Sequence, residues 1–204
     1  GKKMEISNWQ MFPPSQRIQK IAERGIINTF NLLKPENLSL LVKEAKNNSI
    51  QNIFVRLFDE DISYYTDGFI TDNYFPEVVE GARLIADTIG AKNVIFFTPE
   101  NFVLPSEDIS GIDKYKSIQV HFIPVKTRYY PAGTKHDLLN LANKKISLQT
   151  DSGFFVDSST LYSVYNALVL RTPNIDRIIH VSGDVIKTNR EMRVRIGTPV
   201  SSII

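Results

Sequence analysis

The chain has 204 residues, of which 42% are hydrophobic and 23% are charged, the proportions of a folded globular protein. It contains no cysteine, which excludes disulfides, cysteine-ligated zinc, a thiol nucleophile and an iron–sulfur cluster held by these residues alone. The formal net charge of +2 is too small to indicate a nucleic-acid partner. No apolar run is long enough for a transmembrane segment, and no signal-peptide pattern opens the sequence.

Apolar periodicity and the positions of proline and glycine predict the elements. In chain order we expect a helix at 13–24, a helix at 35–47, a strand at 51–58, a helix at 75–89, strands at 93–98 and 118–123, a helix at 134–142, a short strand after residue 153, a helix at 158–170, strands at 177–182 and 192–196, and the start of a helix at 197–199, with Thr198 as its cap. Strands alternating with helices predict an α/β fold with a parallel sheet flanked by helices. Near residue 176 the predicted pattern changes from alternating strands and helices to two successive strands. We therefore expect one domain over 1–175 and the truncated beginning of a second module over 176–204.

An acidic run, Asp59-Glu60-Asp61, follows the first predicted strand. Alternation would direct Asp59 and Asp61 to one side and Glu60 to the other. These carboxylates are suited to orienting a ribose or a ring nitrogen, or to binding a hard cation together with Asp67. The alternative is a solvated loop, which spacing alone favours. The sequence contains neither a dinucleotide-binding glycine fingerprint nor a P-loop.

Two predicted helix starts have the form of anion sites or of plain caps. Residues 130–135 form a turn that leads into a helix, and Asp157 or Ser158 is a candidate N-cap of the helix that follows. The tyrosines at 64, 65, 129 and 130 are candidates for stacking on a ring or for packing. His121 and His180 are expected to be partly buried strand residues. Spacing alone yields no catalytic residue, no metal site and no reaction.

Several stretches nevertheless share motifs with one family: 78–81, 123–126, 153–160, 177–184 and 193–199. In these the chain resembles the flavoprotein-like domain of RnfC, the C subunit of the Rnf electron-transport complex, a domain homologous to the NADH-binding subunit of complex I. The resemblance implies a complex I flavoprotein-like fold, followed from residue 176 by the beginning of a β-grasp SLBB module. It also implies other Rnf subunits as partners, electron transfer involving NADH, a cytoplasmic location peripheral to the inner membrane, and iron–sulfur clusters in a later cysteine-rich segment.

The resemblance also identifies candidate cofactor-binding positions. The family's glycine-rich flavin loop aligns with 25–35, where Asn28 and Phe30 replace glycines whose bare backbone lets a flavin approach. Two acids of the next motif are kept as Asp59 and Asp61, while Arg56 replaces its asparagine. The remaining positions are Gly133, Thr160, which is retained, and Asp157, which replaces an asparagine near the flavin phosphate.

Two hypotheses follow. In the first, the chain is a flavin-free relative with impaired or lost FMN and NADH binding, which keeps the fold in order to dock other subunits. The negative charge of Asp157 and the bulk of Phe30 favour it. In the alternative, the chain is an intact redox domain that passes electrons from NADH through FMN, with Asp59, Asp61, Gly133 and Thr160 in the pocket.

Overall fold

The computed structural model describes residues 8–104, 117–128, 131–148, 150–184, 186 and 188–203. Its elements are η1 (Trp9–Met11), α1 (Pro14–Glu23), β1 (Ile27–Asn28), β2 (Glu36–Asn37), α2 (Leu38–Asn47), β3 (Asn52–Arg56), α3 (Asp67–Ile89), β4 (Asn93–Pro99), β5 (Gln119–Val125), α5 (Lys135–Ile146), β6 (Phe154–Asp157), α6 (Ser158–Leu168), β7 (Asp176–Val181), β8 (Arg190–Arg195) and η2 (Val200–Ser202).

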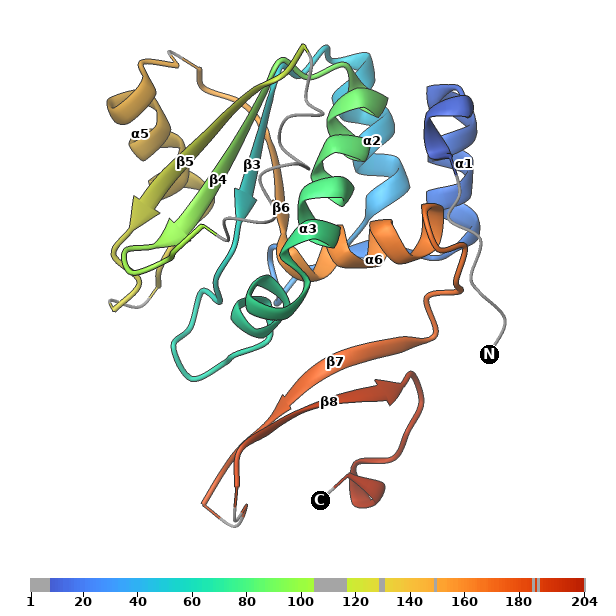
Figure 1. Ribbon diagram of the computed structural model, residues 1–204, viewed down its shortest axis with the longest axis vertical. Helices are drawn as coiled ribbons and strands as arrows, with labels where there is room; N and C mark the ends of the chain where they lie inside the picture. Colours follow the sequence, from blue (N-terminus) through green and yellow to red (C-terminus); the bar gives the residue numbers. More distant parts are fainter. Residues whose placement is uncertain are drawn as a thin grey trace.

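The central sheet has four strands in the order β5-β4-β3-β6, and every pairing in it is parallel. Figure 1 shows the strands side by side, with their carboxyl ends at one edge. β3 and β6 are neighbours, and their register aligns Arg56 with Asp157 at that edge. The sequence-based prediction of a parallel sheet flanked by helices is confirmed.

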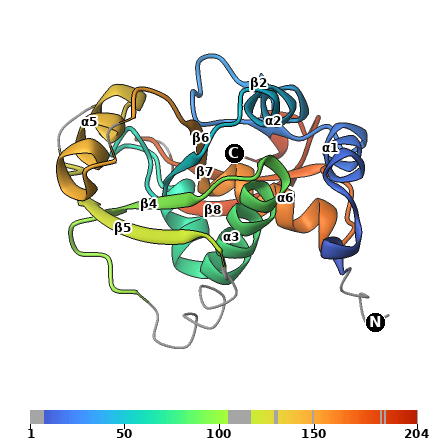
Figure 2. The ribbon, with the colours of Figure 1, turned by 90° about the horizontal axis from the view of Figure 1, so that it is seen from above.

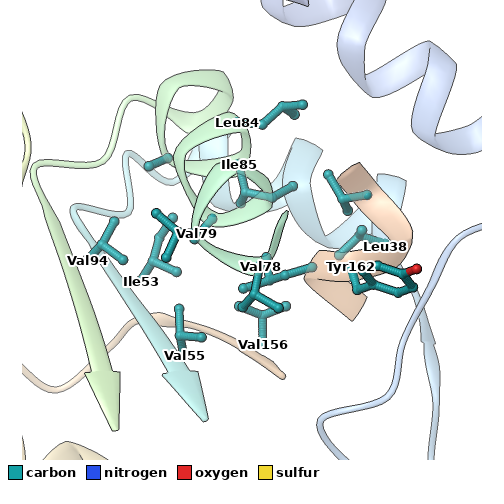
Figure 3. Close-up of a cluster of buried hydrophobic side chains, with 14 of the residues drawn as sticks. Leu38, Ile53, Val55, Val78, Val79, Leu84, Ile85, Val94, Val156 and Tyr162 are labelled. Atoms are coloured by element: carbon teal, nitrogen blue, oxygen red, sulfur yellow. The ribbon is translucent and has the colours of Figure 1, made fainter. Parts of the chain in front are cut away.

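Helices cover both faces of the sheet, with α5 on one side and α2, α3 and α6 on the other (Figure 2). Alternate residues of the buried strands supply the two cores. Ile53 and Val55 face α2, α3 and α6 in the larger cluster, part of which Figure 3 shows, whereas Phe54 packs with Leu138 of α5 in the smaller one. The helices α3 and α6 pack so closely at Gly81 that a Cβ on this residue would lie 2.3 Å from the carbonyl oxygen of Leu161.

The helix predicted at 75–89 is only the second part of α3. The helical segment begins at Asp67 and is broken at Tyr74, whose backbone leaves helical values two residues before Pro76. Proline removes a backbone donor, and its ring clashes with the carbonyl group four residues earlier, so a break in the turn that precedes Pro76 is expected. Sequence periodicity finds the buried second part but misses the first turns, whose N–H groups are satisfied from outside the helix.

The last part of the chain forms an antiparallel pair, β7 with β8, apart from the main sheet (Figure 1). Both strands agree with the sequence-based prediction. The helix expected after residue 197 is wrong: the structure has a single 3-10 turn, η2, with Pro199 rather than Thr198 at its N-cap position and no side-chain cap. Without a capping side chain the turn lacks the acceptor that usually begins an α-helix. That this hairpin opens an SLBB module stays a prediction.

Candidate functional site

The carboxyl edge of the sheet is where parallel α/β folds bind ligands. Six of the seven candidate positions lie around the ends of β3 and β6, and these are Asn28, Phe30, Asp59, Gly133, Asp157 and Thr160. Arg56, the last residue of β3, stands at their centre with 1% of its surface exposed. Side chains of this chain therefore occupy the middle of the candidate site.

Arg56 joins three segments at this edge. One terminal nitrogen, Nη2, donates to the Phe30 carbonyl oxygen at 2.9 Å, and the other, Nη1, donates to Glu60 at 3.1 Å and to the Gly133 carbonyl oxygen at 3.3 Å. Its guanidinium carbon lies 4.2 Å from the centre of the Phe30 ring, within the range of a cation–π contact. Its Nε is buried and has no hydrogen-bond partner among the described residues.

Asn28 and Phe30 are both buried, although they align with loop glycines of the family. The Asn28 side chain donates to the Phe155 carbonyl oxygen at 2.8 Å and accepts from the Phe30 N–H at 3.1 Å. The Phe30 ring packs against that of Phe155, with 5.6 Å between ring centres. The loop is therefore held onto β6 by side chains that glycines do not have.

Gly133 marks a close approach on the other side of Arg56. Its φ of +72° lies in the left-handed region, and a Cβ there would meet the Phe58 ring at 2.8 Å and the Arg56 side chain at 3.1 Å. Only glycine fits this position without strain. The next residue, Thr134, is the N-cap of α5 and accepts from the Asp137 N–H, so the turn predicted here is a capped helix start. Tyr129 and Tyr130, candidates for stacking, lie outside the described residues.

Two buried carboxyl groups occupy the N-terminus of α6. Asp157 is its N-cap and accepts from the Thr160 N–H at 2.8 Å and, through its other oxygen, from the Thr29 hydroxyl at 2.7 Å. Asp67 reaches over from α3 and accepts from the Ser159 N–H at 2.9 Å and from the Ser159 hydroxyl at 2.6 Å. The Thr160 hydroxyl in turn accepts from the Thr29 N–H at 3.0 Å. The predicted cap at Asp157 is confirmed.

The ionisation of Asp67 is strongly perturbed. Burial raises the pKa of its carboxyl group well above the ordinary value, and the neighbouring charges of Asp157 and Asp59 raise it further, while Arg56 and Ser159 oppose the change. A raised pKa keeps this carboxyl group protonated to a higher pH than an ordinary aspartate, which limits the negative charge packed into this junction.

The two acids of the run after β3 have separate roles. Asp59 accepts from the N–H groups of Thr66, Asp67 and Gly68 at 3.0–3.1 Å, which satisfies the start of α3. Asp61 lies farther out and accepts from the N–H and the hydroxyl of Ser63. Both line the same groove, and Glu60 accepts from Arg56. Asp59 also lines the cavity beside Arg56 together with Glu60, and all three residues follow the end of β3, so the expected strand alternation does not describe this run.

A cavity of about 310 Å³ remains beside Arg56, and its walls come from the loop after β1, the starts of α3 and α6, and β7. Ile27, Leu32 and Ile178 line it together with the polar groups described above.

No group of three or more potential metal ligands occurs in the described part of the chain, so the suggestion of a hard cation bound with Asp67 has no support in the geometry. Within the same ranges, no helix is long and apolar enough to cross a membrane.

Sequence reasoning missed Thr29 and Ser159, which complete the hydrogen bonds at the start of α6. Neither residue stands out by spacing, and their role depends on the loop after β1 meeting α6. The partly buried His180 belongs to strand β7, as expected, and its Nδ1 lies 2.9 Å from a Glu191 carboxylate oxygen.

The sequence was compared with family models and with curated proteins. No family model matches the sequence. The chain is 21% identical over 206 residues to the C subunit of the ion-translocating oxidoreductase complex of Buchnera aphidicola subsp. Baizongia pistaciae, an alignment that covers 98% of this chain and 39% of the relative. The corresponding protein of Haemophilus influenzae strain PittEE is 22% identical, with 98% and 31% covered, and that of Rhodobacter capsulatus is 28% identical over 138 residues, with 63% and 25% covered.

Solved structures support the fold. The NAD+-reducing NiFe hydrogenase in its air-oxidised state superposes with a TM-score of 0.73 at 12% identity, over 97% of this chain and 39% of that chain. The same enzyme in its H2-reduced state gives 0.65, with 96% and 41% covered. The resemblance to RnfC and the complex I flavoprotein-like fold are thus confirmed, and the chain spans about two fifths or less of the length of these relatives.

Proposed function

We propose that this chain is a domain of an RnfC-like protein in a membrane-associated electron-transport complex, and that it keeps the flavoprotein-like fold for assembly while its own side chains fill the FMN site. The observation that carries the proposal is the buried Arg56, which ties together the loops around a flavin position. The partners are then other subunits of an Rnf-type complex, at the cytoplasmic side of the inner membrane and peripheral to it.

The first reason for this interpretation is that side chains occupy the space that the flavin ring of FMN would need. A flavin ring needs bare backbone close to it, but Asn28 and Phe30 place buried side chains there, and the Phe30 ring contacts both the Phe155 ring and the Arg56 guanidinium. Opening this space requires breaking the hydrogen bonds of Arg56 to the Phe30 and Gly133 carbonyl oxygens. Buried carbonyl groups that lose their donors are costly to the fold.

The second reason is that the N–H groups that would bind the FMN phosphate are already occupied. A helix N-terminus binds phosphate when its N–H groups are free to donate. At α6 the N–H groups of Ser159 and Thr160 already donate to Asp67 and Asp157. A phosphate brought to this point would meet the charge of Asp157 and compete with both carboxyl groups, so the residues present do not fit FMN.

One observation favours the alternative, an intact domain that transfers electrons from NADH through FMN. The cavity of about 310 Å³ lies at the sheet edge and is lined by Thr160 and Asp59, two positions that the resemblance assigns to cofactor binding. In that case any electron path beyond the flavin uses clusters outside these 204 residues, because they contain no cysteine.

A flavin titration separates the two proposals. The purified chain is titrated into FMN while the quenching of flavin fluorescence is recorded, and NADH is then added to test for bleaching of the flavin absorbance. We expect no quenching up to millimolar FMN and no bleaching. Micromolar binding followed by NADH-dependent bleaching would refute the assembly proposal and establish the redox domain.

A further inference from the structure

A second concave surface lies beside the candidate site, between the loop after β3, the start of α3 and the end of β4. This groove has a volume of about 620 Å³, and the residues used below are Asp61, Ile62, Tyr64, Tyr65, Asp72 and Val103. The neighbouring Asp59 also lines it. None of its described lining residues is a lysine or an arginine.

The charge of the groove is negative and fixed. Hydrogen bonds from the Ser63 N–H and hydroxyl lower the pKa of Asp61, which keeps this exposed carboxylate ionised. Asp72 accepts a hydrogen bond from the Tyr65 hydroxyl, and this bond is the main reason that the pKa of Tyr65 is raised to about 12. Between residues 57 and 80 the sequence has seven acids and no base, although the whole chain carries +2.

The rim of the groove is apolar and aromatic. Ile62 is 69% exposed, Val103 82% and Tyr64 52%. Large apolar side chains gathered around one concavity are typical of a surface that another molecule covers. Exposed tyrosine rings beside carboxylates select a cation, and the planar guanidinium of arginine suits them better than an ammonium group because it stacks on a ring and pairs with a carboxylate.

We propose that this groove docks an arginine-bearing segment of a partner polypeptide, with guanidinium groups on Asp61, Asp72 and the Tyr64 ring and intervening apolar side chains on Ile62 and Val103. The inference rests on the proposed assembly function and names the chemistry of the partner. Charge complementarity selects this occupant, since three carboxylates line a groove without a compensating base among its described residues and would repel an anionic ligand.

The test uses the purified chain and a short amidated peptide that alternates arginine with leucine, titrated at low ionic strength by calorimetry. The matched peptides carry lysine or glutamate in place of arginine. We expect the arginine peptide to bind, the lysine peptide to bind more weakly, and the glutamate peptide not to bind. Absence of binding by the arginine peptide at millimolar concentration would overturn the inference.

Two double variants locate the site. Asp61→Asn with Asp72→Asn removes two charges while keeping both hydrogen-bond acceptors, and we expect it to weaken arginine-peptide binding about tenfold. Glu23→Gln with Glu44→Gln removes the same charge from the exposed surfaces of α1 and α2, and we expect a change of less than about twofold. Equal weakening in the two variants would mean general charge attraction and would overturn the inference.

Two further comparisons test the aromatic part. Tyr64→Ser is expected to weaken binding, whereas Tyr64→Phe keeps the ring and is expected to retain it. Spermine, a small polyamine, serves as the final probe: if it binds as tightly as the arginine peptide, the groove selects for charge alone and the inference is refuted. Because FMN binding is measured separately, a failure here leaves the flavin-free proposal standing, and micromolar FMN binding removes that proposal whatever the peptide does.

Discussion

Replacing Arg56 by methionine tests whether the buried guanidinium holds the carboxyl edge together. Methionine keeps most of the apolar volume against Phe30 but removes the donors to the Phe30 and Gly133 carbonyl oxygens and to Glu60. Each buried acceptor left unsatisfied costs about 1–3 kcal/mol, and loss of one partner of a buried ion pair costs about 3–5 kcal/mol. Because the Glu60 side chain is 31% exposed and can rehydrate, we expect the lower end, about 3 kcal/mol.

Urea unfolding followed by circular dichroism measures this loss. With a denaturant slope of about 2 kcal/mol/M, the midpoint should fall by about 1.5 M. The matched control is Arg195→Met, which removes an exposed arginine and should change stability by less than about 0.5 kcal/mol. If Arg56→Met loses less than about 0.5 kcal/mol, or gains stability, the cost of burying the charge outweighs its contacts and the reasoning is wrong.

Three other predictions follow from individual contacts. Since the folded-state pKa of Asp67 is raised, its contribution to stability is present in acid and is lost as pH rises from about 4 through the folded pKa. Asp67→Asn should therefore raise the urea midpoint at pH 8 relative to wild type, with a smaller gain at pH 5. An equal gain at the two pH values would contradict this. Gly81→Ala places a Cβ 2.3 Å from the Leu161 carbonyl oxygen and should cost at least about 1–3 kcal/mol, read as a lower melting temperature; an unchanged one would show that α3 and α6 can move apart freely. The pKa of Tyr65 is about 12 because of Asp72, so Asp72→Asn should move it toward the ordinary value in a spectrophotometric titration, with Tyr65→Phe identifying the signal, and no movement would refute the assigned cause.

The sequence predicts the fold well because the buried elements leave strong local signals. The apolar runs that become β3 and β4 are almost fully buried and lie close to their expected bounds. The capping residue Asp157 is likewise visible in the sequence, because a polar residue at the end of a strand before a helix is a common N-cap. The first turns of α3 escape prediction, since their N–H groups are satisfied by Asp59 from a loop.

The site is harder to predict because its contacts are non-local. Substitution of the family's glycines and asparagine is visible in the sequence, but it does not show that Arg56 bonds the Phe30 carbonyl oxygen, 26 positions earlier in the chain. The pairing of Asp67 with Ser159 also spans 92 positions and depends on α3 and α6 lying side by side. Such contacts follow from topology, and no local pattern encodes them.

The central claim is that side chains of this chain close the FMN site, and reversing two of them tests it most directly. Phe30→Gly with Asp157→Asn restores the family's glycine at the ring position and its asparagine at the phosphate position. FMN affinity is measured by fluorescence quenching for this variant and for wild type, after circular dichroism has shown that both are folded. We predict no binding by wild type at millimolar FMN and measurable binding by the variant. Micromolar binding by wild type, or a folded variant with no gain in affinity, would contradict the claim.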